Sequence, residues 1–123
     1  MPWALADPEM IAPGWAKTIE AAERHNDPGN FTAFIAYEWS SAPGGDNLHR
    51  VVIYRDDGDK ASQTLPLTFD ETADPEDLWK VLQTYEDTTG GQVMAIAHNG
   101  NWSSGRMFEM TRFNGKAMNR SYA

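Results

Sequence analysis

Residues 93–100 read Val93-Met94-Ala95-Ile96-Ala97-His98-Asn99-Gly100, an apolar run that ends in a polar turn. A short apolar run bounded by a turn signal is typical of a buried strand, and Asn-Gly favours a turn with positive φ. His98 therefore stands where a buried strand meets a loop. In α/β folds such strand ends carry the chemistry, because the strand fixes the side chain and the loop admits substrate.

The segment just before this strand predicts a helix over residues 74–89. Asp74 suits the N-cap and Pro75 the first helical position. The apolar stripe of this helix recurs at helical spacing and consists of Leu78, Val81, Leu82 and Tyr85. Gly90-Gly91 supplies the stop. A helix, a short glycine link and a buried strand together form an α/β unit.

Two further strands are predicted upstream, over residues 31–39 and 48–54, and a glycine-containing loop joins them. Strands joined in this way most often pair as an antiparallel hairpin. Glu38 lies at the end of the first strand and His49 at the start of the second. The hairpin therefore predicts that these two side chains lie near each other.

The remaining segments carry weaker signals. Residues 1–12 are expected to be irregular because prolines interrupt them, and a helix is expected over residues 13–24. Asp56-Asp57-Gly58-Asp59 is expected to end the second strand of the hairpin. From Trp102 onward we expect a loop, with the start of another helix at the end of the chain. All three predicted strands are apolar on both faces and so expect neighbours on both sides.

Composition limits the partners and the metal chemistry. The chain has 123 residues, no cysteine and a formal net charge of -8. Such a charge repels phosphate backbones, and no basic cluster suits an anionic membrane surface, so neither nucleic acid nor membrane is an expected partner. Without cysteine, a metal must be held by His, Asp, Glu or backbone oxygen. No signal-peptide core is found, and the cellular location stays open.

Glu38, His49 and His98 form a candidate set of ligands for a divalent metal ion, with zinc or manganese expected. Imidazole and carboxylate are the ligands that a catalytic metal site without cysteine would use. The alternative for each histidine is an ordinary histidine at a strand end or in a hairpin loop, and the sequence does not decide between the two. A carboxylate at the end of an apolar strand is costly to bury unpaired, so Glu38 should lie beside a cation, a metal or solvent.

Other residues are candidates for contacts to a substrate. Arg50 and Arg106 carry guanidinium groups that suit phosphate or carboxylate, although each taken alone is more often a surface arginine. Trp39 and Trp102 are candidates for the walls of the site, against ordinary packing as the alternative.

Three segments resemble an uncharacterised bacterial family that is similar to the PHP (polymerase and histidinol phosphatase) metallohydrolases. They are residues 34–41 (FIAYEWSS), 47–55 (NLHRVVIYR) and 97–103 (AHNGNWS). This resemblance implies an α/β fold, namely a distorted (β/α)7 barrel with a multinuclear metal site at the strand ends. It implies that Glu38, His49 and His98 are metal ligands and that Arg50 flanks the site as a contact to a substrate anion.

The PHP motifs His-x-His, Asp-His and Asp-x-His do not occur in this sequence. We therefore expect residues 1–123 to be a single incomplete domain, the middle segment of a PHP-like barrel with one β-hairpin and one helix-strand unit. Its metal site is expected to be incomplete, and its exposed sheet edges are expected to favour self-association.

The leading hypothesis for function is a segment of a metal-dependent hydrolase. It would act on a small-molecule ester, a phosphoester in the first place, through a metal-bound hydroxide. The alternative is a catalytically inactive fragment or a binding module without functional metal. A third hypothesis is a small carbohydrate-binding domain that uses Trp39 and Trp102.

Overall fold

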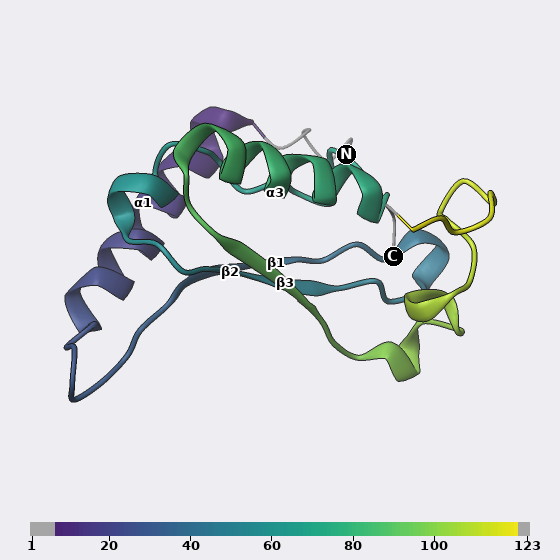
Figure 1. Ribbon diagram of the computed structural model, residues 1–123, viewed down its shortest axis with the longest axis horizontal. Helices are drawn as coiled ribbons and strands as arrows, with labels where there is room; N and C mark the ends of the chain where they lie inside the picture. The colour runs from purple at the N-terminus through teal and green to yellow at the C-terminus, as the bar shows by residue number, and fades with distance from the viewer. Residues whose placement is uncertain (1–6, 121–123) are drawn as a thin grey trace.

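Three antiparallel strands form the centre of the structure, a computed structural model that describes residues 7–120. The strands are β1 (Ile35–Trp39), β2 (Arg50–Tyr54) and β3 (Val93–Ala97), and they lie in the order β1-β2-β3 (Figure 1). The predicted hairpin is confirmed, since β1 pairs antiparallel with β2. The strand predicted at residues 93–97 is also confirmed, and it pairs with the other edge of β2.

Both strands of the hairpin are shorter than predicted. The first was expected from residue 31 but begins at Ile35, because residues 27–31 form a turn instead. In that turn the Phe31 N–H donates to the Asp27 carbonyl at 2.8 Å, and Gly29 has a φ of 92°, which glycine adopts without strain.

Helix α1 (Pro8–His25) begins earlier than the sequence predicted. The expectation that residues 1–12 are irregular is wrong from Pro8 onward, and residues 1–6 lie outside the described part. Pro8 occupies the first helical position, where the missing N–H costs nothing, and the Asp7 carboxylate accepts a hydrogen bond from the Glu9 N–H at 2.9 Å. Pro13 removes one hydrogen bond but does not end the helix.

Helix α3 (Pro75–Thr89) agrees with its prediction, with Asp74 as the N-cap and Gly90 closing it in the left-handed region at φ 66°. The short helix α2 (Gly58–Ala61) was not predicted, because four residues carry no helical periodicity. The loops contain the 3-10 turns η1 (Pro43–Gly45), η2 (Gly100–Trp102) and η3 (Arg106–Phe108). The helix expected at the end of the chain falls on residues 121–123, which lie outside the described part.

The core lies between the helices and one face of the sheet (Figure 1). It consists of Trp15, Ile19, Ile35, Trp39, Val52, Tyr54, Ala61, Leu78, Leu82 and Tyr85. Two polar groups at its border are paired: the Trp15 indole N–H donates to the Ala61 carbonyl at 3.1 Å, and the Tyr85 hydroxyl donates to Asp56 at 2.9 Å. We call this the covered face of the sheet.

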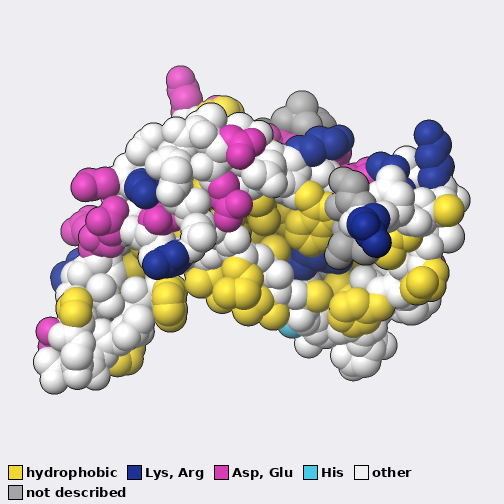
Figure 2. All heavy atoms as spheres, viewed as in Figure 1, with side chains coloured by type: hydrophobic (Ala, Val, Ile, Leu, Met, Phe, Trp, Pro, Cys, Tyr) yellow, Lys and Arg dark blue, Asp and Glu magenta, His cyan; other side chains and the backbone are white. Residues whose placement is uncertain are grey.

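The other face, here called the open face, is not covered by any element of residues 7–120 (Figure 1). Met94 is 57% exposed there, and Ile96 is exposed as well. Acidic side chains gather instead over the helical layer (Figure 2). Among the described residues, no helix combines the length and the apolar character that crossing a membrane requires. The structure is thus mixed α/β, with its helices packed on one side of an antiparallel sheet.

Candidate metal centre

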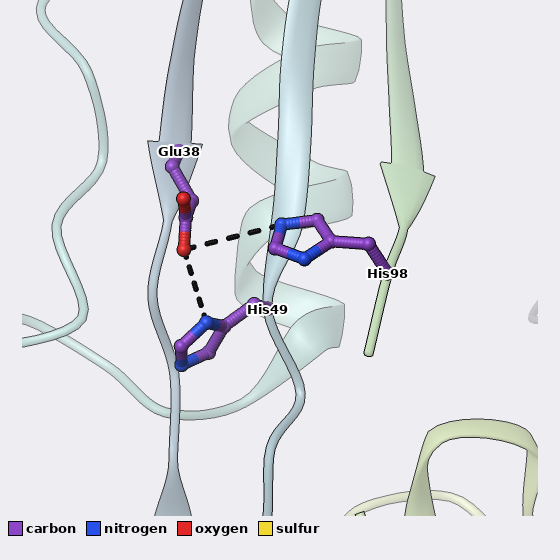
Figure 3. Close-up of side chains that lie close together, drawn as sticks. All are labelled: Glu38, His49 and His98. Atoms are coloured by element: carbon purple, nitrogen blue, oxygen red, sulfur yellow. Dashed lines mark ion pairs between the residues drawn. The ribbon is translucent and has the colours of Figure 1, made fainter. Parts of the chain in front are cut away.

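Glu38, His49 and His98 converge at one end of the open face. One ligand atom from each residue lies within 4.8 Å of those of the other two. Figure 3 shows the two imidazole rings directed toward the carboxylate, with the helical layer behind the sheet. The expectation that the three side chains meet is therefore confirmed, and we call them the Glu38 cluster.

Strand register brings these residues together. Trp39 pairs with Arg50, and Arg50 pairs with Ala97. One residue further along, the His98 N–H donates to the His49 carbonyl at 3.3 Å, so the two histidines are cross-strand neighbours. Side chains alternate between the faces of a sheet, and this alternation places Glu38, His49 and His98 on the same side.

The distances within the cluster approach those that one bound ion requires. Glu38 Oε1 lies 3.0 Å from His49 Nδ1 and 3.9 Å from His98 Nε2. Ligand atoms about 2.0–2.2 Å from a tetrahedral ion lie roughly 3.3–3.6 Å apart. Since the three ligand atoms lie within 4.8 Å of one another, side-chain shifts of about an ångström would close the cluster around an ion.

The His98 ring provides a second observation that fits a cation. Its Nε2 atom is buried and has no hydrogen-bond partner, although it lies 3.9 Å from the Glu38 carboxylate. A buried polar atom without a partner costs about 1–3 kcal/mol. A divalent ion between His98 and Glu38 would satisfy this atom, and the half-exposed carboxylate would leave positions for water or substrate.

Two neighbouring side chains form hydrogen bonds to residues of the cluster. The Ser40 hydroxyl donates to Glu38 Oε1 at 3.0 Å, and Asn47 Oδ1 accepts from the His49 backbone N–H at 2.9 Å. The Ser40 bond orients the Glu38 carboxylate, as groups around metal-binding carboxylates do, whereas the Asn47 bond fixes the backbone at His49. Ser40 was missed from the sequence, although its spacing of two residues from Glu38 on an extended chain was a usable signal.

Arg50 does not lie at the Glu38 cluster. It is only 7% exposed and projects from β2 on the covered face, opposite to its neighbour His49. Its guanidinium group lies 5.9 Å from the Trp39 ring and 5.1 Å from the Trp79 ring, and it donates to the Leu48 carbonyl. It lines a separate pocket of about 370 Å3. The expectation that Arg50 flanks the site is wrong, because adjacent strand residues point to opposite faces.

Arg106 and Trp39 have structural contacts, the alternative that the sequence left open for each of them, and Trp102 is exposed. Arg106 donates to the Pro43 carbonyl and to Asp46, each at 3.2 Å, and so fixes a loop. Hydrogen bonds from Ser104 and Arg106 lower the pKa of the Asp46 carboxyl. Trp39 is fully buried in the core and cannot wall a site, whereas Trp102 is 72% exposed.

One family model matches the chain over residues 4–123, and its description is "Protein of unknown function (DUF3604)". The chain belongs to the DUF3604 family. No curated protein and no solved structure is significantly similar to the chain. Because the DUF3604 description names no activity, the functional assignment of this DUF3604 chain rests on the geometry of the Glu38 cluster.

Proposed function

We propose that the Glu38 cluster binds one divalent metal ion and that the domain is a segment of a metal-dependent hydrolase acting on phosphoesters. The observation that carries this proposal is the convergence of one carboxylate and two imidazoles, with all three ligand atoms within 4.8 Å of one another. Zinc and manganese are the ions that suit such a donor set.

The residues of the chain have distinct roles in this proposal. Glu38, His49 and His98 hold the ion, while Ser40 orients the Glu38 carboxylate and Asn47 fixes the backbone at His49. A bound divalent ion supplies Lewis acidity, which lowers the pKa of water and polarises a phosphoryl oxygen. The open face leaves the carboxylate half-exposed, so substrate can approach from solvent.

The finer part of the proposal is that the fold is a middle segment of a PHP-like barrel. It is supported by the placement of all three ligands at one end of neighbouring strands, as the resemblance implies. The sequence holds three histidines, and only two of them lie in the cluster. Three protein ligands can hold one ion, so we expect a single weak site rather than a multinuclear centre.

Calorimetric titration of the full chain with Zn²⁺ and Mn²⁺ tests metal binding. We expect at most one ion per chain, with weak affinity. Glu38→Gln and His98→Ala should each weaken binding at least tenfold, because each removes one of three ligands. Matched controls are Glu20→Gln and His25→Ala, which change exposed residues of α1 outside the cluster and should leave binding unaltered.

Two results would count against this part of the proposal. Binding that is insensitive to Glu38→Gln and His98→Ala would place the ion elsewhere. Tight binding of two or more ions would contradict the single weak site.

Hydrolysis of a generic aryl phosphodiester with added manganese tests the reaction. We expect negligible turnover by this chain and turnover by a longer relative that carries these motifs together with His-x-His and Asp-x-His, because clamping both the attacking and the leaving oxygen needs a complete metal cluster. Robust turnover by this chain that His98→Ala abolishes would show that the three-ligand site is sufficient. A longer relative that binds metal but hydrolyses no phosphoester would refute the assigned reaction.

A further inference from the structure

A shallow hollow of about 380 Å3 adjoins the Glu38 cluster and shares His49 with it. Its lining consists of Ala42, Gly45, Asn47, His49, Asn99 and Trp102. Pockets that hold drug-sized ligands measure about 300–1,000 Å3, so this one has room for a single small ring. We call it the Trp102 hollow.

Trp102 is presented to solvent from a fixed backbone. Its side chain is 72% exposed, but its backbone is bonded on both sides. The backbone N–H of Trp102 donates to the Asn99 carbonyl at 3.0 Å, and the Trp102 carbonyl accepts from the backbone N–H of Asn47 at 2.9 Å. The second bond ties the loop after β3 to the loop between β1 and β2. An exposed aromatic ring on an anchored backbone loses little further freedom when a ligand stacks on it.

Two carboxamides border this aromatic surface. The Asn47 Oδ1 atom accepts from the His49 N–H, which fixes the amide beside the metal ligand. Asn99 is exposed and holds a left-handed backbone conformation with φ 56°. A carboxamide both donates and accepts hydrogen bonds, which suits hydroxyl groups at the edge of a ring.

The charges of the hollow restrict the ligand further. Apart from His49, none of its lining residues is titratable. This lining offers no charged partner to a phosphate and so favours an uncharged part of the substrate, while the phosphate would be bound at the proposed metal centre. Trp102 contributes the one indole ring of the lining, and the only other aromatic group there is the His49 imidazole, which belongs to the Glu38 cluster.

We infer that the Trp102 hollow binds the sugar ring of a glycosyl phosphoester, with the phosphate directed to the Glu38 cluster. A pyranose ring offers C–H bonds on one face, which pack against the negative face of an indole, and hydroxyls at its edge for Asn47 and Asn99. This inference rests on the proposed function, since it names the substrate class of that same site.

Saturation-transfer NMR on the full chain, with and without Zn²⁺, tests this inference through binding alone. Four probes separate the contributions of the sugar ring, the phosphate and an aromatic ring to binding: methyl glucopyranoside, glucose 1-phosphate, glycerol 1-phosphate and phenyl phosphate. We expect transfer to the ring protons of the glucopyranoside without Zn²⁺, and tighter binding of glucose 1-phosphate with Zn²⁺. Glycerol 1-phosphate, which has no ring, should bind more weakly than glucose 1-phosphate in either condition.

Variants assign the binding to the hollow. Trp102→Ala should weaken glucopyranoside binding by about two- to tenfold. Phe108→Ala is the matched control, since Phe108 is 77% exposed on the neighbouring η3 but does not line the hollow. Asn99→Gly removes an amide while permitting the left-handed backbone, and it should weaken the sugar probes but not phenyl phosphate.

The outcomes separate this inference from the proposed function. Binding of the glucopyranoside that depends on Trp102 supports the sugar subsite. If Zn²⁺ then has no effect on the affinity for glucose 1-phosphate, only the proposed metal centre is refuted. If Glu38→Gln abolishes the tightening of glucose 1-phosphate binding by Zn²⁺ but leaves the glucopyranoside signal intact, the result supports both the sugar subsite and the metal centre. Equal binding by wild type and Trp102→Ala overturns the inference, and so does a preference for phenyl phosphate over glucose 1-phosphate.

Discussion

The two faces of the sheet differ in what their side chains do. On the covered face, Trp39, Val52 and Tyr54 are buried against helices. On the open face, Met94 and Ile96 are exposed, and the Glu38 cluster lies at the end of the same surface. Because successive side chains of a strand point to opposite faces of the sheet, each strand contributes residues to both faces. Core residues and residues of the proposed metal site therefore alternate along the same strands, and substitutions on the two faces should have separable effects.

The largest difference should appear when one apolar side chain is truncated on each side of the sheet. Leu78 is fully buried on α3 against the covered face, and Leu78→Ala should lower the free energy of unfolding by about 2–5 kcal/mol. Met94→Ala on the open face should cost less than about 1 kcal/mol. Urea denaturation measures both. If Leu78→Ala does not fold, Leu78→Met provides the milder comparison. Equal losses for the two faces would mean that the open face is covered in solution.

Alkaline pH should destabilise the covered face. Burial raises the pKa of the Tyr54 hydroxyl to about 12, from an ordinary value of 10.0, and burial also raises the pKa of Tyr37 and Tyr85. A raised pKa in the folded state gives stability that is present below pH 10 and is lost as the pH rises toward 12. At about 1.4 kcal/mol per pKa unit, the loss from Tyr54 is at most roughly 3 kcal/mol.

Unfolding free energies between pH 8 and 12 test this expectation. Tyr54→Phe retains the ring and should reduce the pH dependence, with the other two tyrosines responsible for what remains. If the stability of Tyr54→Phe has the same pH dependence as that of the wild type, folding does not raise the pKa of Tyr54.

A metal ion should stabilise the protein through the open face. At ten times its Kd, an ion that binds only the folded state adds about 1.4 kcal/mol. Thermal unfolding with increasing Zn²⁺ measures the gain, which His98→Ala should abolish and the α1 variant His25→Ala should retain. A gain that survives in His98→Ala would locate the ion outside the Glu38 cluster.

The smallest contrast compares two carboxylates with different roles. Asp74 caps α3 by accepting from the Glu76 N–H at 2.8 Å, and Asp74→Ala should cost about 1 kcal/mol. Glu38→Gln without metal should change the free energy of unfolding by less than about 0.5 kcal/mol, because the side chain is half-exposed. Chemical denaturation in the presence of a chelator measures both. A loss for Glu38→Gln as large as that for Asp74→Ala would assign Glu38 a structural role.

Local signals were sufficient to predict much of this fold. Helix α3 has a cap, a periodic stripe and a glycine stop within one segment, and all three agree with the structure. The start of α1 was predicted wrongly because Pro8 and Pro13 suggested a break, whereas one proline lies at a tolerated position and the other is compensated by the buried Trp15 and Ile19. Helix α2 was too short to leave a pattern.

The candidate site was predictable for a different reason. Glu38 and His49 meet because a hairpin joins them, which is a local relation. His98 joins them only because β3 pairs with β2, a long-range choice that no local pattern specifies. The side of Arg50, in contrast, followed from strand alternation alone: once His49 is assigned to the site, its neighbour must point to the other face.

The pairing of β2 with both neighbours gives a bound ion an influence on how the chain folds. If β2 slipped by one residue against β1 and β3, Arg50 would replace His49 beside Glu38, and the core side chains Val52 and Tyr54 would turn toward solvent. A guanidinium group does not ligate a cation, so the proposed three-ligand site would be complete only in the native alignment. During refolding a bound ion would therefore stabilise the native strand register relative to mispaired sheets. The three side chains proposed to bind the metal would then also contribute to correct pairing of the strands.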